Sequence, residues 1–369
     1  MSELAATTLQ KIEKKVAAAE RLTPDEGLFL LQPDVDLHLV GQLADRVRQR
    51  VAGDRVFYNI NAHLNPTNAC IFGCPLCAYS CEASDPRAFT LGEEQMLQAA
   101  RDAAEAGCTE LHIVGGVHPE WPFERYHEII ARVHRSQPQL HLKGWTAVEI
   151  AWFAEQTHQP PADVLRALMD AGLGSLPGGG AEIFAAEVRK RICPRKAEAE
   201  VWLDVHRAAH ALGLPSNATM LFGHVESATH RIDHLLRLRE LQDESADAPA
   251  GFQAFVPLVF HPENTALASL PKTSADDVLR TVAVSRLMLD NFTHVKAYWV
   301  SLGIGLAQTA LSYGANDLDG TVRQERIHHA AGADSPEVLS VGQLRHLIEE
   351  TGRRPVERDS LYQEVRCGG

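Results

Sequence analysis

The chain has 369 residues, of which 45% are hydrophobic and 22% are charged, values typical of a globular protein that can bury a full core. Its formal net charge of −13 offers no broad basic field to DNA, RNA or anionic lipid. The N-terminal stretch is charged and amphipathic, unlike a secretory leader, and no apolar run is long enough to span a membrane. We therefore expect a cytoplasmic protein with no nucleic-acid partner and no membrane partner.

Residues 1–53 predict a helical extension in front of the main domain. Apolar residues recur at helical spacing through 9–16 and again through 37–51. Thr23 followed by Pro24 is a typical helix start, with the threonine as N-cap and the proline in the first helical position.

From residue 56 onward, short β-type runs alternate with helical stretches, an order that predicts a parallel sheet. The predicted strands are 56–62, 110–114, 141–145, 174–176, 217–221, 252–259, 295–300 and 316–318. The predicted helices between them are 92–106, 122–135, 161–171, 181–191 with 197–212, 228–243, 274–290 and 302–312. About eight such units predict an α/β fold, a closed (β/α)8 TIM-type barrel over 54–320, with a C-terminal helix and irregular tail at 321–369.

Several predicted strands end in glycine or in polar residues, at 115–116, 177–180, 223–224 and 261–262. The carboxyl ends of barrel strands carry the active site, and glycine there lets the backbone approach a ligand closely. These segments are therefore the first places to look for functional residues.

Four of the seven cysteines fall within residues 70–81. Cys70, Cys74 and Cys77 have the spacing C-x3-C-x2-C and follow the first predicted strand. Three thiolates on one short loop can bind three irons of a [4Fe–4S] cluster and leave the fourth iron open. Cys81 leaves an alternative, a structural zinc or ferredoxin-like cluster with four thiolates. The position on a strand-end loop favours the three-cysteine site.

The other three cysteines, Cys108, Cys193 and Cys367, are scattered along the chain. Free cysteine is commonly buried as a small hydrophobic residue, and we expect these to be ordinary thiols.

The cysteine motif, its place after the first strand and the downstream pair Gly115-Gly116 resemble the radical S-adenosylmethionine (SAM) superfamily. One position departs from that pattern, because the residue before the third cysteine is usually aromatic and here it is Leu76. Tyr79, just after the motif, is the ring that could lie near SAM instead.

Longer strings narrow the resemblance to the subgroup that holds aminofutalosine synthase, cyclic dehypoxanthinylfutalosine synthase and the deazaflavin (FO) synthase subunit. They are NAHLN at 61–65, VGGVHP at 114–119, TAVEI at 146–150, LPGGGAEI at 176–183, NATM at 217–220, GHVE at 223–226, FHPENT at 260–265 and KAYW at 296–299. The FHPEN string and the helix LLRLRELQDE at 235–244 favour the aminofutalosine synthase family.

That resemblance implies a reaction of menaquinone biosynthesis. A 5′-deoxyadenosyl radical from SAM would add to the enol-ether double bond of 3-[(1-carboxyvinyl)oxy]benzoate, with aryl migration and loss of CO2 or bicarbonate. The products would be 6-amino-6-deoxyfutalosine and methionine, so SAM is consumed. A reductant such as flavodoxin or ferredoxin would supply the electron, and a homodimer is compatible with the sequence. A sister reaction that starts by hydrogen abstraction and releases 5′-deoxyadenosine remains an alternative.

The resemblance and the strand-end positions together give a set of candidate site residues. The cluster ligands are Cys70, Cys74 and Cys77. The SAM-binding candidates are Tyr79, Gly115, Gly116, Thr146, Glu149 and Glu182. The catalytic candidates are His63, His224 and His261, and the candidates for binding the substrate are Asn65, His118 and Arg286.

Several of these candidates also have a structural alternative. The glycine pair could be a tight turn, Glu182 an acid at a helix N-terminus, each histidine a satisfied packing residue, and Arg286 a packing or solvated arginine of a helix. Phe260, Tyr298 and Trp299 could line a dry pocket for the radical, although aromatic residues on barrel strands are more often core.

Overall fold

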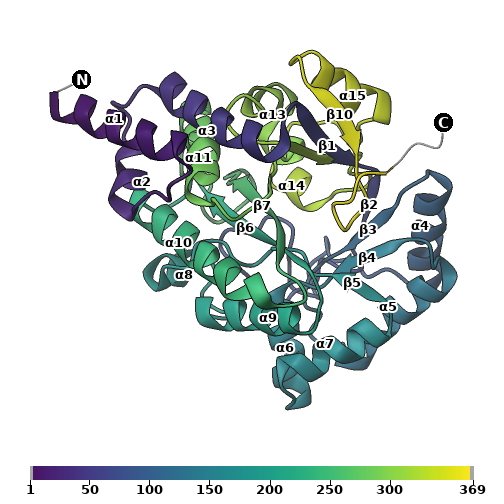
Figure 1. Cartoon of the computed structure of the whole chain (residues 1–369). Coiled ribbons are helices and arrows are strands. Elements are labelled where there is room, and N and C mark those ends of the chain that lie inside the picture. Colours follow the sequence, from purple (N-terminus) through teal and green to yellow (C-terminus); the bar gives the residue numbers. More distant parts are fainter. Residues whose placement is uncertain (1–2, 366–369) are drawn as a thin grey trace.

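The computed structural model describes residues 3–365, in which helices surround a ring of parallel strands (Figure 1). The strands are β1 (Arg55–Asn59), β2 (Asn61–Leu64), β3 (Glu110–Ile113), β4 (His141–Gly144), β5 (Leu173–Ser175), β6 (Ser216–Phe222), β7 (Phe252–Val259), β8 (His294–Val295), β9 (Asp317–Gly320) and β10 (Arg354–Glu357). The helices are α1 (Glu3–Ala17), α2 (Pro24–Leu30), α3 (Leu37–Ala52), α4 (Glu93–Glu105), α5 (Phe123–Ser136), α6 (Ala147–Thr157), α7 (Pro161–Asp170), α8 (Ala186–Ile192), α9 (Ala199–Ala211), α10 (Ala228–Glu244), α11 (Ala275–Met288), α12 (Trp299–Leu302), α13 (Ile304–Ala310), α14 (Ile327–Ala330) and α15 (Val341–Glu349), with a 3-10 turn at Ser245–Asp247.

Three parallel sheets join edge to edge into the ring. Their strand orders are β10-β1-β9, β2-β3-β4-β5 and β6-β7-β8. Isolated parallel bridges join their edges, pairing Leu176 with Ser216, Lys296 with Asp317 and Ala62 with Arg323. The order therefore runs from β2 through β9 and back to β2, and these eight strands form the barrel that the alternation of elements predicted.

The first predicted strand, 56–62, is interrupted at Ile60. Its first half, β1, pairs with β9 and β10, whereas its second half, β2, pairs with β3. The Ile60 carbonyl accepts a hydrogen bond from the N–H of Thr109, at the point where the chain changes neighbours. One apolar run thus forms two short strands that belong to different sheets, and its composition alone did not predict this.

Other predicted elements were confirmed or corrected by the structure. The predicted last barrel strand is β9, and Thr23 caps α2 in a reciprocal hydrogen-bonded pair with Glu26. The strand predicted at 295–300 is wrong beyond Val295, because Tyr298 is the N-cap of helix α12. The prediction that the C-terminal tail is irregular is also wrong, because the tail contains strand β10, which pairs with β1.

The N-terminal extension is helical as predicted and packs on the outside of the ring. Helix α3 packs against α11, and α2 packs against both α10 and α11 (Figure 1). On α3, a Cβ added to Gly41 would lie 2.6 Å from the ring of Tyr313, so only glycine allows this close approach.

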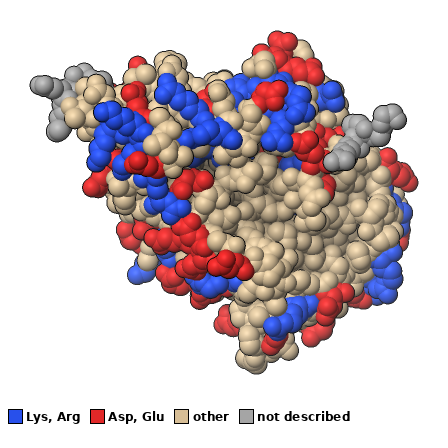
Figure 2. Space-filling view, in the orientation of Figure 1, with Lys and Arg blue, Asp and Glu red and all other residues tan. Residues whose placement is uncertain are grey.

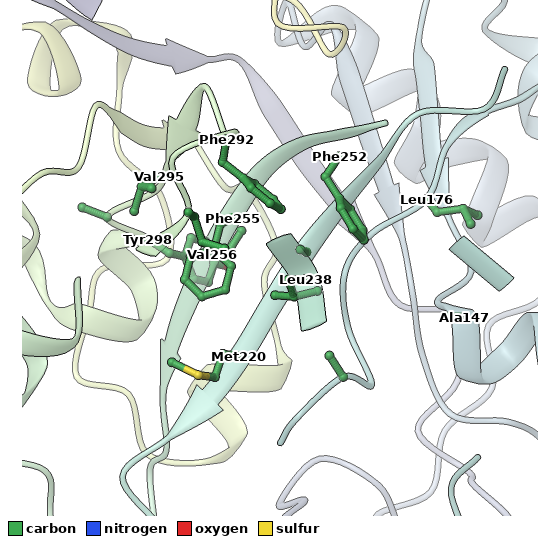
Figure 3. Packing of buried hydrophobic residues seen from close by; sticks show 14 of the residues in the cluster. Ala147, Leu176, Met220, Leu238, Phe252, Phe255, Val256, Phe292, Val295 and Tyr298 are labelled. Carbon is green, nitrogen blue, oxygen red and sulfur yellow. The ribbon is translucent and has the colours of Figure 1, made fainter. Parts of the chain in front are cut away.

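The hydrophobic core lies between the strands and the helices. Around β7, the rings of Phe252 and Phe292 stack with centroids 5.6 Å apart, and Phe255 meets Phe292 edge-on (Figure 3). Stacked and edge-on aromatic pairs fix the position of β7 against its neighbours. No helix among the described residues is long and apolar enough to cross a membrane.

The face of the molecule in Figure 2 carries Lys and Arg mixed with Asp and Glu around its rim. The hollow near the middle of this face is lined mainly by residues without charge.

Candidate active site at the carboxyl ends of the barrel strands

The loop that carries the cysteine motif runs from the end of β2 to the start of α4. Its two arms are held together by backbone hydrogen bonds: Leu91 N–H to Pro66, Asn68 N–H to Phe89, Cys70 N–H to Cys81, and Cys81 N–H to Asn68. The three cysteines of the motif lie inside this closed loop, so their backbone is fixed before any ligand binds.

The thiols of the motif are free, with Cys74 buried and Cys70 and Cys77 partly exposed. The Ser80 N–H donates to the Cys77 sulfur at 3.3 Å, as expected beside a metal-bound thiolate. Burial raises the pKa of the Cys74 thiol to about 12, although Lys196 opposes this effect. A metal must therefore displace the proton of Cys74.

The three free thiols of the motif on one loop suit a multinuclear cluster. Among residues 3–365, no group of three or more His, Cys, Asp or Glu side chains could hold one metal ion. The same finding applies to Cys70, Cys74 and Cys77 with or without Cys81, so the three-cysteine site and the four-thiolate site stay alternatives. A cubane cluster needs each thiolate to bind a different iron, and three cysteines on one loop suit that arrangement.

Gly115 and Gly116 lie directly against the cysteine loop. A Cβ added to Gly116 would lie 2.2 Å from the Ala69 carbonyl oxygen, and one added to Gly115 would lie 2.8 Å from that of Thr67. The Gly116 N–H donates to Thr67 at 2.8 Å. The glycine pair therefore seats the loop, and contact with SAM by the same backbone stays a prediction.

Thr146 and Glu149 form the start of α6, a helix that we did not predict. The Thr146 N–H donates to Glu149 Oε2 at 2.6 Å, while Glu149 Oε1 is buried without a hydrogen-bond partner. Burial raises the pKa of the Glu149 carboxyl to about 7. An unpartnered buried carboxyl oxygen can accept a hydrogen bond from a ligand, and contact of Glu149 with SAM stays a prediction.

Glu182 follows the three glycines after β5 and has a left-handed backbone, with φ of 47°. Its carboxylate lies 2.5 Å from the Lys196 ammonium in a largely buried ion pair. Lys196 holds the pKa of Glu182 below its usual range, despite the opposing effect of burial. The carboxylate is therefore negative and already partnered in the absence of ligand.

The predicted histidines have different surroundings. His63 on β2 is buried, its ring lies 4.7 Å from that of His112, and its Nε2 has no hydrogen-bond partner. His224 is enclosed by its own loop, with Nε2 near the Leu221 carbonyl and Nδ1 near the Val225 N–H and Glu226. His261 Nε2 bonds to the Ser301 carbonyl at 2.9 Å.

The predicted substrate residues do not all gather at one place. Asn65 donates to the Val114 carbonyl, joining the ends of β2 and β3, and its Oδ1 has no partner. The ring of His118 stacks on Trp121 at 5.0 Å.

Arg286 lies fully buried in α11. It donates to the carbonyls of Phe292 and Gly314 and to Asn316, all before the strands β8 and β9 begin. Burial lowers its pKa to about 9. The structure thus places Arg286 at the opposite end of the barrel from the cysteine loop, where it joins segments of the fold.

Tyr79 lies at the base of the cysteine loop. Its hydroxyl donates to the Thr67 carbonyl at 3.2 Å and its ring meets Phe89 edge-on. Tyr79 also lines a cavity of about 1050 Å³ that extends to His63 and to Glu325 and His329 beyond β9. Contact between Tyr79 and SAM stays a prediction.

We did not predict two groups near these residues. His112 lies beside His63 on β3, and Glu325 lies after β9. The Glu325 carboxylate is buried and accepts the backbone N–H groups of Ile327 and His328 and the imidazole of His329. The alternation of polar and apolar residues around His112 indicates a face in water, so it did not point to a site inside the barrel. The position of Glu325 depends on long-range contacts.

The remaining cysteines outside the motif behave as expected where they are described. Cys108 and Cys193 are buried free thiols, and Cys367 lies outside the described residues.

Two family models and several curated proteins match the chain. The model of the radical SAM superfamily matches residues 64–238, and that of the CofH/MqnC C-terminal region matches residues 249–367. The aminodeoxyfutalosine synthase of Thermus thermophilus is 42% identical, over 96% of this chain and 95% of that protein. The aminodeoxyfutalosine synthase of Streptomyces coelicolor is 41% identical, over 97% of this chain and 94% of that protein. The chain belongs to the radical SAM superfamily.

Other members are also similar in sequence. The 5-amino-6-(D-ribitylamino)uracil–L-tyrosine 4-hydroxyphenyl transferase of Methanopyrus kandleri is 39% identical over 93% of this chain and 94% of that protein. The superfamily uses a [4Fe–4S] cluster and SAM, which the donor set of the cysteine loop suits.

Solved structures support the barrel fold. Methylornithine synthase has a TM-score of 0.73 and 19% identity, over 93% of this chain and 97% of that one. The FeFe-hydrogenase maturase HydG from Carboxydothermus hydrogenoformans has a TM-score of 0.75 and 16% identity, over 96% of this chain and 80% of that one.

Proposed function

We propose that this radical SAM protein is an aminofutalosine synthase of menaquinone biosynthesis. It would add the 5′-deoxyadenosyl group of SAM to the enol-ether double bond of 3-[(1-carboxyvinyl)oxy]benzoate, with aryl migration and loss of CO2 or bicarbonate. The products are 6-amino-6-deoxyfutalosine and methionine. The observation that carries this proposal is the 41–42% identity to two aminodeoxyfutalosine synthases over nearly the whole chain.

In this proposal Cys70, Cys74 and Cys77 bind the cluster, which, when bound and reduced, supplies the electron that cleaves SAM. The closed backbone of the cysteine loop supports this role, because it fixes the three thiols relative to Gly115 and Gly116. Glu182 and Glu149 would accept hydrogen bonds from the ammonium or ribose of SAM in this proposal.

The reacting carbon needs surroundings that exclude water and hydrogen donors. Phe260, Tyr298 and Trp299 are buried and follow the ends of β7 and β8. The Trp299 indole N–H is occupied by the Gly320 carbonyl at 2.8 Å, so its ring presents only apolar edges elsewhere. We assign the rings of Phe260 and Trp299 to the wall of the reaction pocket, and leave out Tyr298 because its phenolic O–H is a hydrogen donor.

A one-electron donor is a required partner, and a flavodoxin or ferredoxin fits that role. A homodimer remains a prediction from the sequence.

A second candidate function is transfer of a 4-hydroxyphenyl group from tyrosine to 5-amino-6-(D-ribitylamino)uracil. The 39% identity to the Methanopyrus kandleri transferase favours it, because this value is close to that for the two synthases. Both reactions form a bond to an aryl-bearing small molecule, so the fold does not separate them.

The test is an anaerobic assay of the reconstituted protein with dithionite, SAM and each substrate in turn, with products identified by mass spectrometry. The proposal predicts an adenosine-containing adduct of 3-[(1-carboxyvinyl)oxy]benzoate and an equal amount of methionine. Free 5′-deoxyadenosine as the stoichiometric product would refute the addition reaction. Product from tyrosine and 5-amino-6-(D-ribitylamino)uracil alone would establish the second candidate.

A further inference from the structure

The interior of the barrel contains a layer of paired charges. Lys143 lies 2.7 Å from Glu110, Lys296 lies 2.9 Å from Asp319, and Arg358 lies 2.5 Å from Asp317. All six side chains are nearly buried. The opposite faces of β3 and β4, which carry Leu111, Ile113 and Leu142, belong to the hydrophobic core. Three cations therefore balance three carboxylates inside the ring.

Two imidazoles lie next to this layer without a counter-ion of their own. His63 and His112 are paired in register on β2 and β3, and therefore point to the same side of the sheet. Their ring centroids are 4.7 Å apart with an interplanar angle of 36°. Along the strands, His112 is in register with Lys143, whose ammonium is already held by Glu110.

The imidazoles of His63 and His112 have nitrogen atoms that are free to bond a ligand. His63 Nε2 is buried and has no hydrogen-bond partner, whereas buried polar atoms are normally satisfied. His112 remains partly exposed although it lies in a barrel strand. The cavity of about 1050 Å³ that Tyr79 lines also reaches His63, so His63 borders space that a ligand could occupy.

A carboxylate is the ligand chemistry that suits two unpaired imidazoles in this position. Each imidazole can donate an N–H, and hydrogen bonds to an ionised acceptor are the strong ones. Lys143, Lys296 and Arg358 are each engaged by a protein carboxylate, so they have no free charge to offer.

We propose that His63 and His112 together bind one carboxylate of an aryl dicarboxylate substrate inside the barrel. This inference rests on the proposed function for the identity of the dicarboxylate. It adds His112 to the candidate site and gives His63 a binding role.

The charge state of the pair predicts a pH dependence of this binding. Burial lowers the pKa of His63, and it lowers that of His112 to about 3, so both are neutral without ligand. The groups that face them include Glu110, Asp319 and Glu325, which favour the protonated form, and Lys143 and His328, which oppose it. A bound carboxylate favours the imidazolium, so binding takes up a proton from solvent and strengthens as the pH falls.

The test uses 3-(carboxymethoxy)benzoate, a saturated dicarboxylate that lacks the reactive double bond. Isothermal titration of this probe into the reconstituted, SAM-bound protein measures Kd without turnover. We expect His112→Phe and His63→Phe each to raise Kd by about 10- to 100-fold, the loss of a charge-assisted hydrogen bond. The double variant His63→Gln/His112→Gln keeps amide donors but cannot take up a proton, so its Kd should no longer fall with decreasing pH.

His141→Phe is the matched control. His141 is also a barrel histidine, on β4, but its Nε2 already bonds to Ser175 Oγ at 2.8 Å. Its replacement should leave Kd within about twofold.

Wild-type Kd in a folded His112→Phe variant would overturn the inference, as would failure of the unaltered protein to bind the probe. If the adduct forms but the variants keep wild-type KM and Kd, only this inference fails. If no adduct forms but probe binding is lost in the variants, the proposed function fails and the dicarboxylate site stands.

Discussion

Gly116→Ala tests whether the glycine pair positions the cluster loop. The new Cβ would lie 2.2 Å from the Ala69 oxygen and 2.7 Å from the Ala69 carbonyl carbon, both backbone atoms. Relief of this contact to beyond 3.0 Å requires the backbone next to Cys70 to move by about 1 Å, since no flexible side chain can give way. We expect the variant to fold but to bind little iron.

The expected loss of stability in Gly116→Ala is small, and this determines which assay is sensitive enough. Overpacking of this kind costs about 1–3 kcal/mol. For a chain of 369 residues, an unfolding entropy of about 2.1 cal/mol/K per residue converts that cost into a melting shift of only about 1–4 °C. The sensitive measurements are therefore the iron content and the visible absorbance of the reconstituted protein, with circular dichroism to confirm the fold.

Two further glycine variants calibrate the result. In Gly115→Ala the added Cβ would lie 2.8 Å from the Thr67 oxygen, so we expect a smaller loss of iron. Gly305→Ala is the control, because a Cβ there meets nothing within 4 Å. Iron content equal to wild type in a folded Gly116→Ala protein would refute the argument that this close approach sets the loop.

Three other predictions concern the cluster, the buried charges and pH. Replacement of Cys70, Cys74 or Cys77 by alanine should abolish cleavage of SAM, whereas Cys81→Ser should keep the cluster; loss of iron in Cys81→Ser would support four-thiolate binding instead. Lys143→Met should lower the free energy of unfolding by about 3–5 kcal/mol, since it leaves Glu110 buried and unpaired, and adding Glu110→Gln should recover part of that loss in denaturant titration. The hydrogen bond to Glu325 raises the pKa of His329 to about 9. The stability that the protonated His329 contributes is therefore complete below about pH 6.5 and is lost as the pH rises through about 9. Melting curves against pH should therefore flatten in His329→Gln, and an unchanged pH profile in that variant would count against the pairing.

Local patterns were sufficient to predict most elements of the barrel. Alternating apolar runs and helical periods predicted nearly all of the strands, and the cysteine loop was placed correctly after the first one. Helix α6 was not predicted because its aromatic and β-branched residues resemble a strand, although Thr146 and Glu149 at its start form a capping pair that was visible in the sequence.

The interior of the barrel was much harder to predict. Glu110, His112 and Lys143 alternate with apolar residues, which in an ordinary sheet indicates a face in water. Only closure of the ring brings these side chains together and buries them. Arg286 was difficult to interpret for a different reason. The sequence of its helix does not indicate that this arginine is fully buried against backbone carbonyl groups.

The pairing of β1 with β10 constrains the order of events during synthesis. Arg55 is in register with Arg354, so the two strands are separated by about 300 residues. At about 5–20 residues per second, the ribosome makes β10 about 15–60 s after β1. Until β9 is made, neither edge of β1 has a strand beside it, and one edge stays unpaired until β10 follows, although the cysteine loop is already made. An unpaired strand edge invites association with other chains, so a nascent chain that stalls before residue 354 should be prone to aggregate.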